Sequence, residues 1–423
     1  MPGQAHGCPA QFLLVVAHGI DSICVQGLAT HLDTKGCNAV PCNYTVFQSV
    51  LNHLPWSAFD KLVDTHQTDA LSRSFSSRDQ LIALLFAQFS GASSLREVEA
   101  VMESHQGRLR GFGVKAPKRS TFADANRERD PRVFSGLLEV MLLGCPRSFR
   151  RKMDGAVRLI DSTSLRLAGR GAQWARFSAS VFGAKTHVVL DPDHKRPVYH
   201  AVTAANVNDI TAAKAMPIEK GATYVFDLGY YDFGWWAQLD AAGCRFVTRL
   251  KTNTPLEEII RLPVPAGSNI LSDRIGFLPE RQAKNRKNPF AHAVREIVVQ
   301  TETGKSLRIV SNDLDGDAQE IADLYKRRWE IELFFRLLKQ ALKVAKFLGR
   351  SENAVRIQIA VALIAYLLLR TLHENTQPVY SFLELVRLLR ANLMHNKDVT
   401  KMRPPKPSRR LDSRRRNLDS IAA

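Results

Sequence analysis

The stretch YKRRWEIELFFRLLKQ, residues 325–340, predicts a helix with four reactive or charged side chains on one face. In chain order these are Tyr325, Arg328, Glu332 and Lys339, which stand three, four and seven residues apart. At roughly 100° per helical residue, they fall within about 60° of one another. The face therefore combines a phenol, a guanidinium, a carboxylate and an ammonium, whereas Glu330 points nearly the opposite way.

Taken by itself, this face has an ordinary explanation. Glu332 could form a surface ion pair with Arg328 or Arg336, which would contribute under about 1 kcal/mol. Two further acids shift the balance, because Asp161 lies in the apolar run VRLIDS and Asp227 ends the run TYVFDLG. Carboxylates embedded in strand cores cost free energy unless they bind something positive.

The three acids together suit a hard metal ion. If Asp161, Asp227 and Glu332 converge, their oxygens match the preference of Mg²⁺, which keeps some water ligands and completes its shell with phosphate oxygens. Two such ions, roughly 3.5 to 4 Å apart, activate the attacking oxygen and stabilise the leaving one in phosphoryl transfer. We therefore expect these acids to be both catalytic and metal-binding, with two Mg²⁺ ions that Mn²⁺ can replace.

The patterns on the N-terminal side of this helix predict alternating strands and helices. The expected strands are VRLIDSTSLRL, FSASVFGAKTHVVLDP, RPVYHAVTA, ATYVFDLGY and CRFVTRLK, and the second and third form a hairpin with a turn at residues 191–195. Helices are expected at NDITAAKAM and at residues 233–242. Strands flanked by helices indicate an α/β fold with a mixed sheet.

The chain divides into four predicted regions. Residues 43–150 have helical periodicity, with Ser77 as an N-cap, and predict an all-α domain that could bind DNA. Residues 151–375 form the catalytic domain, interrupted at about 251–317 by a β-rich insertion and closed by long helices at 317–346 and 351–372. Residues 376–423 hold a shorter helix at 381–393 and a basic tail that is disordered in isolation.

The first 42 residues differ from the rest, with one Lys, no Arg and no clear period. One hypothesis is an overextended translation start. Since the next methionine is Met102, a start near Asn43 would need an alternative initiation codon.

A net charge of +18 and a pI near 9.8 indicate a polyanionic partner such as nucleic acid. Ribosome or anionic-membrane binding would explain the charge equally well. The most apolar run, residues 359–369, is shorter than the roughly 20 residues of a membrane-spanning helix and predicts a buried core helix. No basic residue precedes the apolar residues 10–17, and the six cysteines fit neither zinc pairs nor a disulfide scaffold, so a cytoplasmic location is expected.

Several other side chains are weaker candidates. Ser120 and Thr121 open a short helix flanked by basic residues, which is either a phosphate site or a solvated loop. We expect core packing for Trp235, Trp236 and Trp329, although each could stack on a flipped base, and for His187 on a strand. Lys185, also on a strand, has a small chance of reaching DNA. The acidic turn with Asp191, Asp193 and His194 is not expected to bind metal.

The motifs resemble those of the insertion-sequence-four group of DDE transposases. The resemblance rests on IDST around Asp161, DLGY around Asp227 and the Y-x2-R-x3-E-x6-K signature that begins at Tyr325, and it covers about residues 43–375. It implies an RNase H-like core, a β insertion between the second Asp and the Glu, and Mg²⁺-dependent cut-and-paste transposition. It also implies that Tyr325, Arg328 and Lys339 contact DNA phosphates.

The same resemblance implies the partners and the reaction. Such enzymes bind the terminal inverted repeats of an element, hydrolyse its 3′ ends and join them to target double-stranded DNA, with a homodimer holding the paired ends near the bacterial nucleoid. Two alternatives share part of the pattern: an inactive transposase-derived DNA-binding protein, and an RNase H-like nuclease that cuts without strand transfer.

Overall fold

A computed structural model describes residues 44–396, apart from residues 71, 112, 145–154, 168–171, 179, 282–286, 343, 345 and 376–379. The expectations for residues 1–42, for the boundary at 150/151 and for the tail after residue 396 lie outside the described residues. Within the described range, helices and strands follow the predicted order, first seven helices and then a mixed succession of both.

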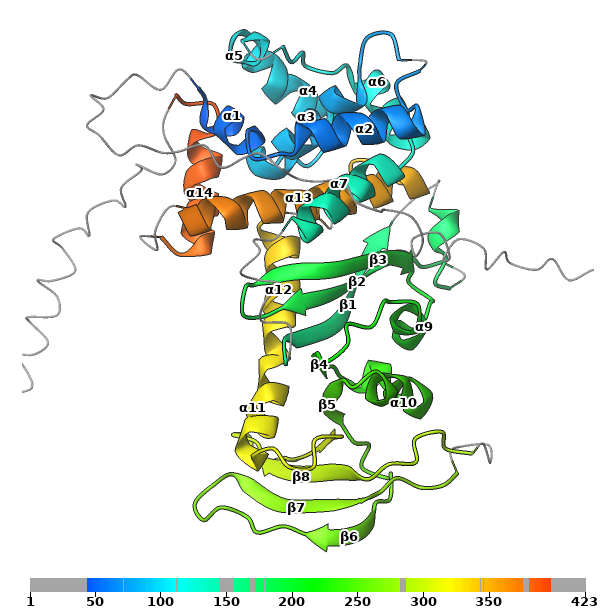
Figure 1. Cartoon of the computed structure of the whole chain (residues 1–423). Helices are drawn as coiled ribbons and strands as arrows, with labels where there is room; N and C mark the ends of the chain where they lie inside the picture. Colours follow the sequence, from blue (N-terminus) through cyan, green and yellow to red (C-terminus); the bar gives the residue numbers. More distant parts are fainter. Residues whose placement is uncertain are drawn as a thin grey trace, which may run out of the picture. The chain divides into compact units, whose positions relative to one another are not determined.

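A nine-stranded sheet organises the second part of the chain, in the order β3-β2-β1-β4-β5-β9-β8-β7-β6 (Figure 1). β1 pairs antiparallel with β2 and β2 with β3, whereas β4 and β5 run parallel to β1. This is the strand order of an RNase H-like core, and it confirms the predicted fold class. The strands are β1 Val157–Leu167, β2 Phe182–Asp191, β3 Arg196–Ala204, β4 Thr223–Val225, β5 Arg245–Arg249, β6 Glu257–Arg261, β7 Ile270–Phe277, β8 Val294–Gln300 and β9 Ser306–Ser311.

The inserted strands continue the central sheet. β6 to β9 form an antiparallel meander, and its last strand, β9, pairs with β5. Cross-strand charges stabilise this part: Arg295 donates to Asp273 with both side chains buried, and Arg274 and Arg308 both pair with the buried Glu296. Because each of these strands pairs with the next, with one register shift in each of the β6–β7 and β7–β8 pairs, the expected β-rich insertion extends the central sheet.

The two faces of the sheet are covered by different helices. α11 Ala318–Arg327 and α12 Trp329–Gln340 run end to end along one side in Figure 1, and α12 contacts β1. α9 Asp209–Lys214 and α10 Phe233–Ala241 lie on the other. Successive residues of a strand face opposite sides, so β1 divides its side chains between two cores. Leu159 packs in the core that includes α12, and Ile160 packs in the core that includes α10.

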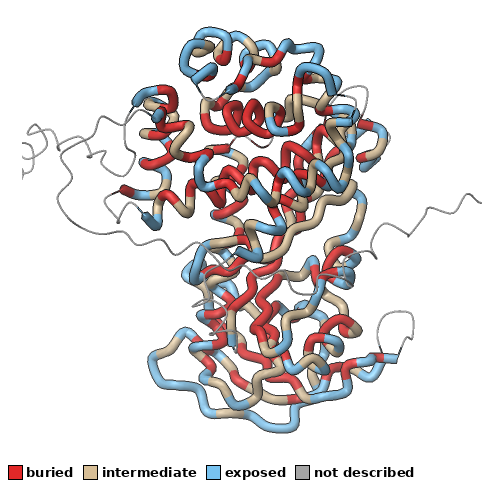
Figure 2. The backbone as a smooth tube through the Cα atoms, turned by 45° about the horizontal axis from the view of Figure 1, so that its top comes forward, coloured by how far each residue is buried: buried red, intermediate tan, exposed pale blue. Residues whose placement is uncertain are grey.

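The first seven helices form an all-α region, as predicted. In α3, the N-cap is Ser76 and not the expected Ser77, because Ser76 and Asp79 form a capping box. α3 is buried almost all round, since it lies among the other helices and against α13 (Figure 2). The helices are α1 Val46–Leu51, α2 Trp56–His66, α3 Ser77–Ser90, α4 Leu95–Ser104, α5 Gln106–Arg110, α6 Arg119–Glu128 and α7 Arg132–Leu143.

The apolar run at residues 359–369 lies in the 24-residue helix α13, Glu352–Asn375, and α14 Phe382–Asn392 follows it. Helix α13 is long and apolar enough to cross a membrane by length and composition alone, but 83% of its most apolar window is buried inside the protein. It contacts α3, α6 and α7 from the N-terminal region and α12 from the catalytic part. The prediction of a buried core helix is therefore confirmed.

The expectation of one continuous helix over residues 317–346 is wrong. One turn residue, Arg328, interrupts the helix while keeping helical backbone angles: Arg328 N–H donates to Tyr325 O and Ile331 N–H donates to Arg328 O, both three residues apart. α12 then ends at Gln340. These short-range bonds replace the four-residue bonds of a regular α-helix, so the helix is divided beside the predicted signature residues.

Candidate active site

Asp161 lies on β1, and Asp227 lies two residues beyond the end of the neighbouring parallel strand, β4. The last registered pair is Leu159 with Val225, and Asp161 and Asp227 each follow that pair by two residues. β4 ends at Val225, so Asp227 is free of the ladder, and its carboxylate accepts a hydrogen bond from Gly229 N–H at 2.8 Å. Both acids have the strand parity of Leu159 and Val225, which pack in the core that includes α12.

The environment of Asp161 disfavours its charge. Burial and, to a smaller extent, the negative charges of Asp227 and Glu332 together raise the pKa of Asp161 to about 7. A hydrogen bond from Ser162 N–H at 2.7 Å and the positive charge of Arg328 oppose the rise. The three predicted acids therefore lie within electrostatic range of one another, and their mutual repulsion is the reason a cation would be stabilised here.

Glu332 projects from α12, which packs against β1, and its carboxylate pairs with Arg328 Nη2 at 2.7 Å. The ordinary ion pair considered from the sequence thus exists, yet it lies beside the two strand acids. Within the described part of the chain, no three His, Cys, Asp or Glu side chains are placed to hold one ion. The acids are neighbours, but their oxygens are not gathered around a single point.

Tyr325 and Arg328 accompany the acids, and Lys339 does not. The guanidinium of Arg328 lies 5.9 Å from the centroid of the Tyr325 ring. Burial raises the pKa of Tyr325 and the charge of Asp227 adds to this, while Arg328 and Arg249 lower it. Lys339 is half-buried two helical turns beyond Glu332, about 10 Å further along α12.

Arg249 is a residue that the sequence reasoning missed. The ladder pairs Val225 with Val247, and Arg249, the last residue of β5, follows that pair by two residues, as Asp227 does on its own segment; Arg249 is exposed. It has the parity of Val247, which faces the core that includes α12. The available signal was its position near the end of CRFVTRLK, since parallel strands bring their carboxyl ends to one edge of a sheet.

Asp209 is a second missed residue, at the start of α9. Its Oδ1 accepts from Ser162 Oγ at 2.6 Å and pairs with Lys185 Nζ at 3.1 Å. Lys185 also donates to Val207 O, so its ammonium is held inside the protein and the small chance that it reaches DNA is not supported. No periodicity or motif distinguished Asp209, because its partners come from β1 and β2.

The remaining candidates are structural, with one exception. Trp235 and Trp236 are fully buried in the core beside α10, as expected. Trp329 is 52% exposed, so core packing was the wrong expectation for it. His187 is buried against Thr203 Oγ1, and burial lowers its pKa to about 4, which fits the expected core histidine.

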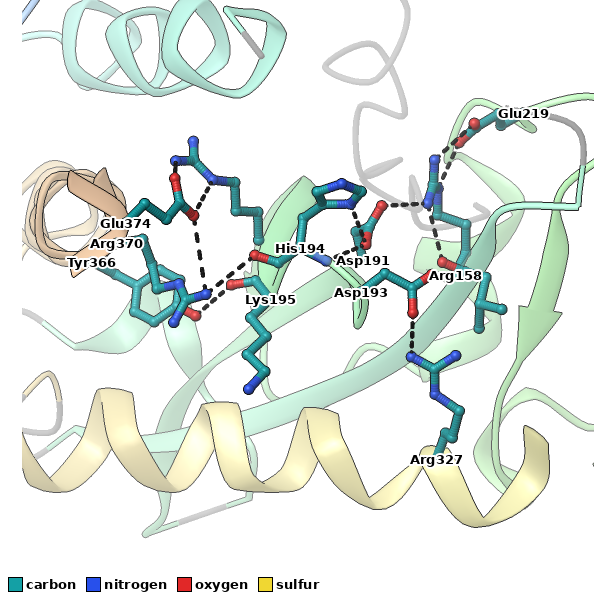
Figure 3. Close-up of polar contacts among 12 residues, drawn as sticks. Arg158, Asp191, Asp193, His194, Lys195, Glu219, Arg327, Tyr366, Arg370 and Glu374 are labelled. Atoms are coloured by element: carbon teal, nitrogen blue, oxygen red, sulfur yellow. Dashed lines mark hydrogen bonds and ion pairs between the residues drawn. The ribbon is translucent and has the colours of Figure 1, made fainter. Parts of the chain in front are cut away.

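The acidic turn between β2 and β3 is an ion-pair network (Figure 3). Asp191 accepts from buried Arg158, Asp193 accepts from Arg327 at 2.6 Å, and the His194 ring lies 3.2 Å from Asp191. These acids are occupied by internal cations, in keeping with the expectation that they hold no metal.

The start of α6 is also occupied by the protein's own acids. Glu99 accepts from Arg119 N–H at 3.1 Å, and Lys118 pairs with Glu103 at 2.8 Å. A phosphate at this helix terminus would have to displace Glu99.

A known protein family matches the part of the chain that contains the candidate acids. The family described as transposase DDE domain matches residues 152–368, which include Asp161, Asp227, Tyr325, Arg328, Glu332 and Lys339. A second family, described as a domain of unknown function, matches residues 42–115.

Two relatives match over most of their length. The y4zB protein of Sinorhizobium fredii, which carries a provisional transposase name, is 37% identical over 69% of this chain and 82% of its own. A protein of Geobacillus stearothermophilus, named as a transposase for the insertion sequence element IS5377, is 28% identical over 72% of this chain and 79% of its own.

One solved structure, a cryo-EM synaptic complex of piggyBac transposase with hairpin DNA, aligns over 89% of this chain and 85% of that chain. The sequence identity is 13% and the TM-score is 0.43, which is too low to carry a conclusion.

Proposed function

The chain belongs to the transposase DDE domain family, and on that premise we propose that it is an insertion-sequence DNA transposase with Asp161, Asp227 and Glu332 as its catalytic acids. One observation carries the assignment of residues. Asp161 on β1 and Asp227, two residues past the end of the neighbouring strand β4, lie close to the helix that bears Glu332, and burial together with the charges of Asp227 and Glu332 raises the pKa of Asp161 to about 7.

The chemistry of these side chains fits a divalent metal. Carboxylate oxygens are the ligands that Mg²⁺ prefers, and Mn²⁺ accepts the same set. Asp161, Asp227 and Glu332 would hold the metal, and two bound ions would supply activation of the attacking oxygen and stabilisation of the leaving oxygen. A cation would also offset the repulsion that the three acids exert on one another.

Arg328 has two roles in this proposal. In the protein alone, it neutralises Glu332 through the 2.7 Å ion pair. When DNA binds, its guanidinium exchanges the carboxylate for a phosphate, because bidentate contacts of arginine with phosphate are strong. Glu332 is then released toward Asp161 and Asp227.

Three further groups would hold the DNA backbone. Tyr325 and Arg249 lie near the acids, so they are placed to contact the scissile phosphate, while Lys339 would contact a phosphate further along. Exposed Trp329, beside Arg328, is the tryptophan available for stacking on a base. The net charge of +18 favours association with nucleic acid in general.

The proposed reaction is cut-and-paste transposition. The protein binds terminal inverted repeats, hydrolyses the 3′ ends and joins the freed hydroxyls to target DNA, acting as a homodimer on paired ends in the bacterial cytoplasm. An RNase H-like nuclease would share the acids but would give no strand-transfer product.

The test is cleavage of DNA carrying the element's own ends, with Mg²⁺ or with EDTA, by wild type, Glu332→Gln and Glu330→Gln. Glu330 is a matched control, because it lies on the same helix and pairs with Arg327 at 3.0 Å, away from the acids. We expect metal-dependent nicking and joining that Glu332→Gln loses and Glu330→Gln keeps, with DNA binding retained by both. Equal activity of the two variants, or cutting in EDTA, would refute the proposal.

A further inference from the structure

We propose that Asp209 is a positioning residue for Asp161 and Asp227 and that it acts from the face of the sheet opposite to Glu332. This inference rests on the proposed function, because it matters for catalysis only if the two strand acids carry the chemistry. The contacts of Asp209 lead to each of these acids by a separate route.

The first route runs through Ser162. Ser162 Oγ donates to Asp209 Oδ1 at 2.6 Å, and Ser162 N–H donates to Asp161 Oδ1 at 2.7 Å. Adjacent strand residues face opposite sides, so Ser162 reaches the α9 side while Asp161 faces the α12 side. Asp209 thus anchors, from behind, the residue whose N–H orients the Asp161 carboxylate.

The second route runs through Gly229. A Cβ built on Gly229 would lie 2.9 Å from Asp227 Oδ1 and 3.3 Å from Asp209 Oδ2. Glycine therefore lets the Asp209 side chain lie against the turn whose Gly229 N–H donates to Asp227 Oδ1. Asp209 limits the room into which this turn, Leu228–Tyr230, can move.

Two basic side chains lie against the Asp209 carboxylate. Lys185 Nζ lies 3.1 Å from Asp209 Oδ1, and His187 Nδ1 lies 3.6 Å from the same oxygen. Lys185 also donates to Val207 O at 2.9 Å, which fixes its ammonium. The Asp209 side chain is only 25% exposed, so this charged pair is partly shielded from water and stiffer than a surface pair.

The same contacts distinguish positioning from metal binding. Asp209 Oδ1 is occupied by Ser162 Oγ and by the Lys185 ammonium, which Val207 O holds inside the protein. Residues behind a metal ligand typically change metal affinity or activity by about 10- to 100-fold when they are removed. That range is the effect expected of Asp209.

The first arm of the test measures positioning directly, by hydrogen exchange of the full-length protein without metal. Asp209→Asn keeps the shape of the side chain and loses its charge. Asp232→Asn is the matched control, since Asp232 also pairs with a lysine, Lys214, at 2.7 Å and asparagine still caps α10. We expect faster exchange in both 157–167 and 226–231 for Asp209→Asn alone. Unchanged exchange in both segments would overturn the inference.

The second arm measures the consequence, as Mn²⁺ affinity by titration and as cleavage of terminal DNA. Asp209→Asn should lower both by about 10- to 100-fold while DNA-end binding stays unchanged. In the Asp209→Asn/Ser162→Ala double variant, hydrogen exchange in 157–167 should be little faster than in the faster of the two single variants, because both residues belong to the same series of hydrogen bonds. Additive effects on that segment, or wild-type Mn²⁺ affinity in Asp209→Asn, would contradict the proposed role.

The two arms separate the two proposals. If wild-type protein binds no Mn²⁺ but Asp209→Asn still loosens both segments, the proposed function fails and the positioning contacts stand. If wild type binds Mn²⁺ and cuts DNA but Asp209→Asn matches it in both arms, the positioning role alone is refuted.

Discussion

Arg328 Nη2 lies 2.7 Å from the Glu332 carboxylate, so the third predicted catalytic acid is neutralised by its own helix neighbour. The Arg328 side chain is only 16% exposed, and it also lies close enough to Asp161 to lower its pKa. One guanidinium therefore offsets repulsion among acids that would otherwise destabilise one another.

Replacing Arg328 separates its two proposed roles. In Arg328→Ala, Mn²⁺ affinity should be equal to that of wild type or higher, because Glu332 loses its competing partner. The rate of DNA cleavage should fall by about 10²- to 10³-fold, as for loss of one group that stabilises transition-state charge. Mn²⁺ titration and single-turnover cleavage measure the two effects, and Arg336→Ala, an exposed arginine of the same helix, is the control. Weaker Mn²⁺ binding in Arg328→Ala would contradict the exchange of partners.

The stability of metal-free protein should fall with rising pH through Asp161. Its folded pKa of about 7 lies above the ordinary value of 3.8. Its contribution to stability is therefore fully present below about pH 4 and is lost as pH rises through 7. In EDTA, Asp161→Asn should gain stability over wild type between pH 4 and 8, by a few kcal/mol at most. Urea unfolding at several pH values tests this, and parallel pH profiles of the two proteins would refute it.

Arg249 should contact a DNA phosphate. Because each phosphate contact releases counterions, Arg249→Ala should weaken DNA binding and reduce the slope of log affinity against log salt by about 1. Fluorescence anisotropy at several salt concentrations measures this. Lys214→Ala is the control, since Lys214 is held by Asp232 at 2.7 Å, and it should leave the slope as in wild type. An unchanged slope in Arg249→Ala would exclude the contact.

Arg158 should be the most costly cation to remove. Its side chain is 3% exposed and pairs with Asp191 at 2.9 Å and Glu219 at 2.7 Å (Figure 3). Arg158→Met leaves Asp191 buried without its cation, which should cost about 3 to 5 kcal/mol of unfolding free energy. Arg127→Met, which breaks exposed pairs with Asp124 and Glu128, should change the free energy of unfolding far less. Urea unfolding of the two variants tests the difference.

The pattern of apolar and polar residues predicted most of the helices and strands, because it reflects interactions between residues that are close in sequence. Apolar periodicity placed the helices and the strands of the core, and polar turn residues placed the β2–β3 hairpin. It failed at Arg328, where one turn residue divides the predicted helix, since helical periodicity does not register a change from four-residue to three-residue bonding. It also failed at Trp329, because exposure depends on what packs against a helix face.

The sequence by itself determined the family, the α/β fold class and the identity of the three candidate acids, because buried strands and helical spacing produce recognisable patterns among neighbouring residues. Only the tertiary structure decided that Asp161 lies near Asp227, that Arg249 lies near Tyr325, that Glu332 pairs with Arg328, and that Asp209 lies behind the acids. Strand register and helix docking set these relations between residues far apart in the chain. The sheet brings these charged side chains together, and their spacing along the sequence does not predict that they meet.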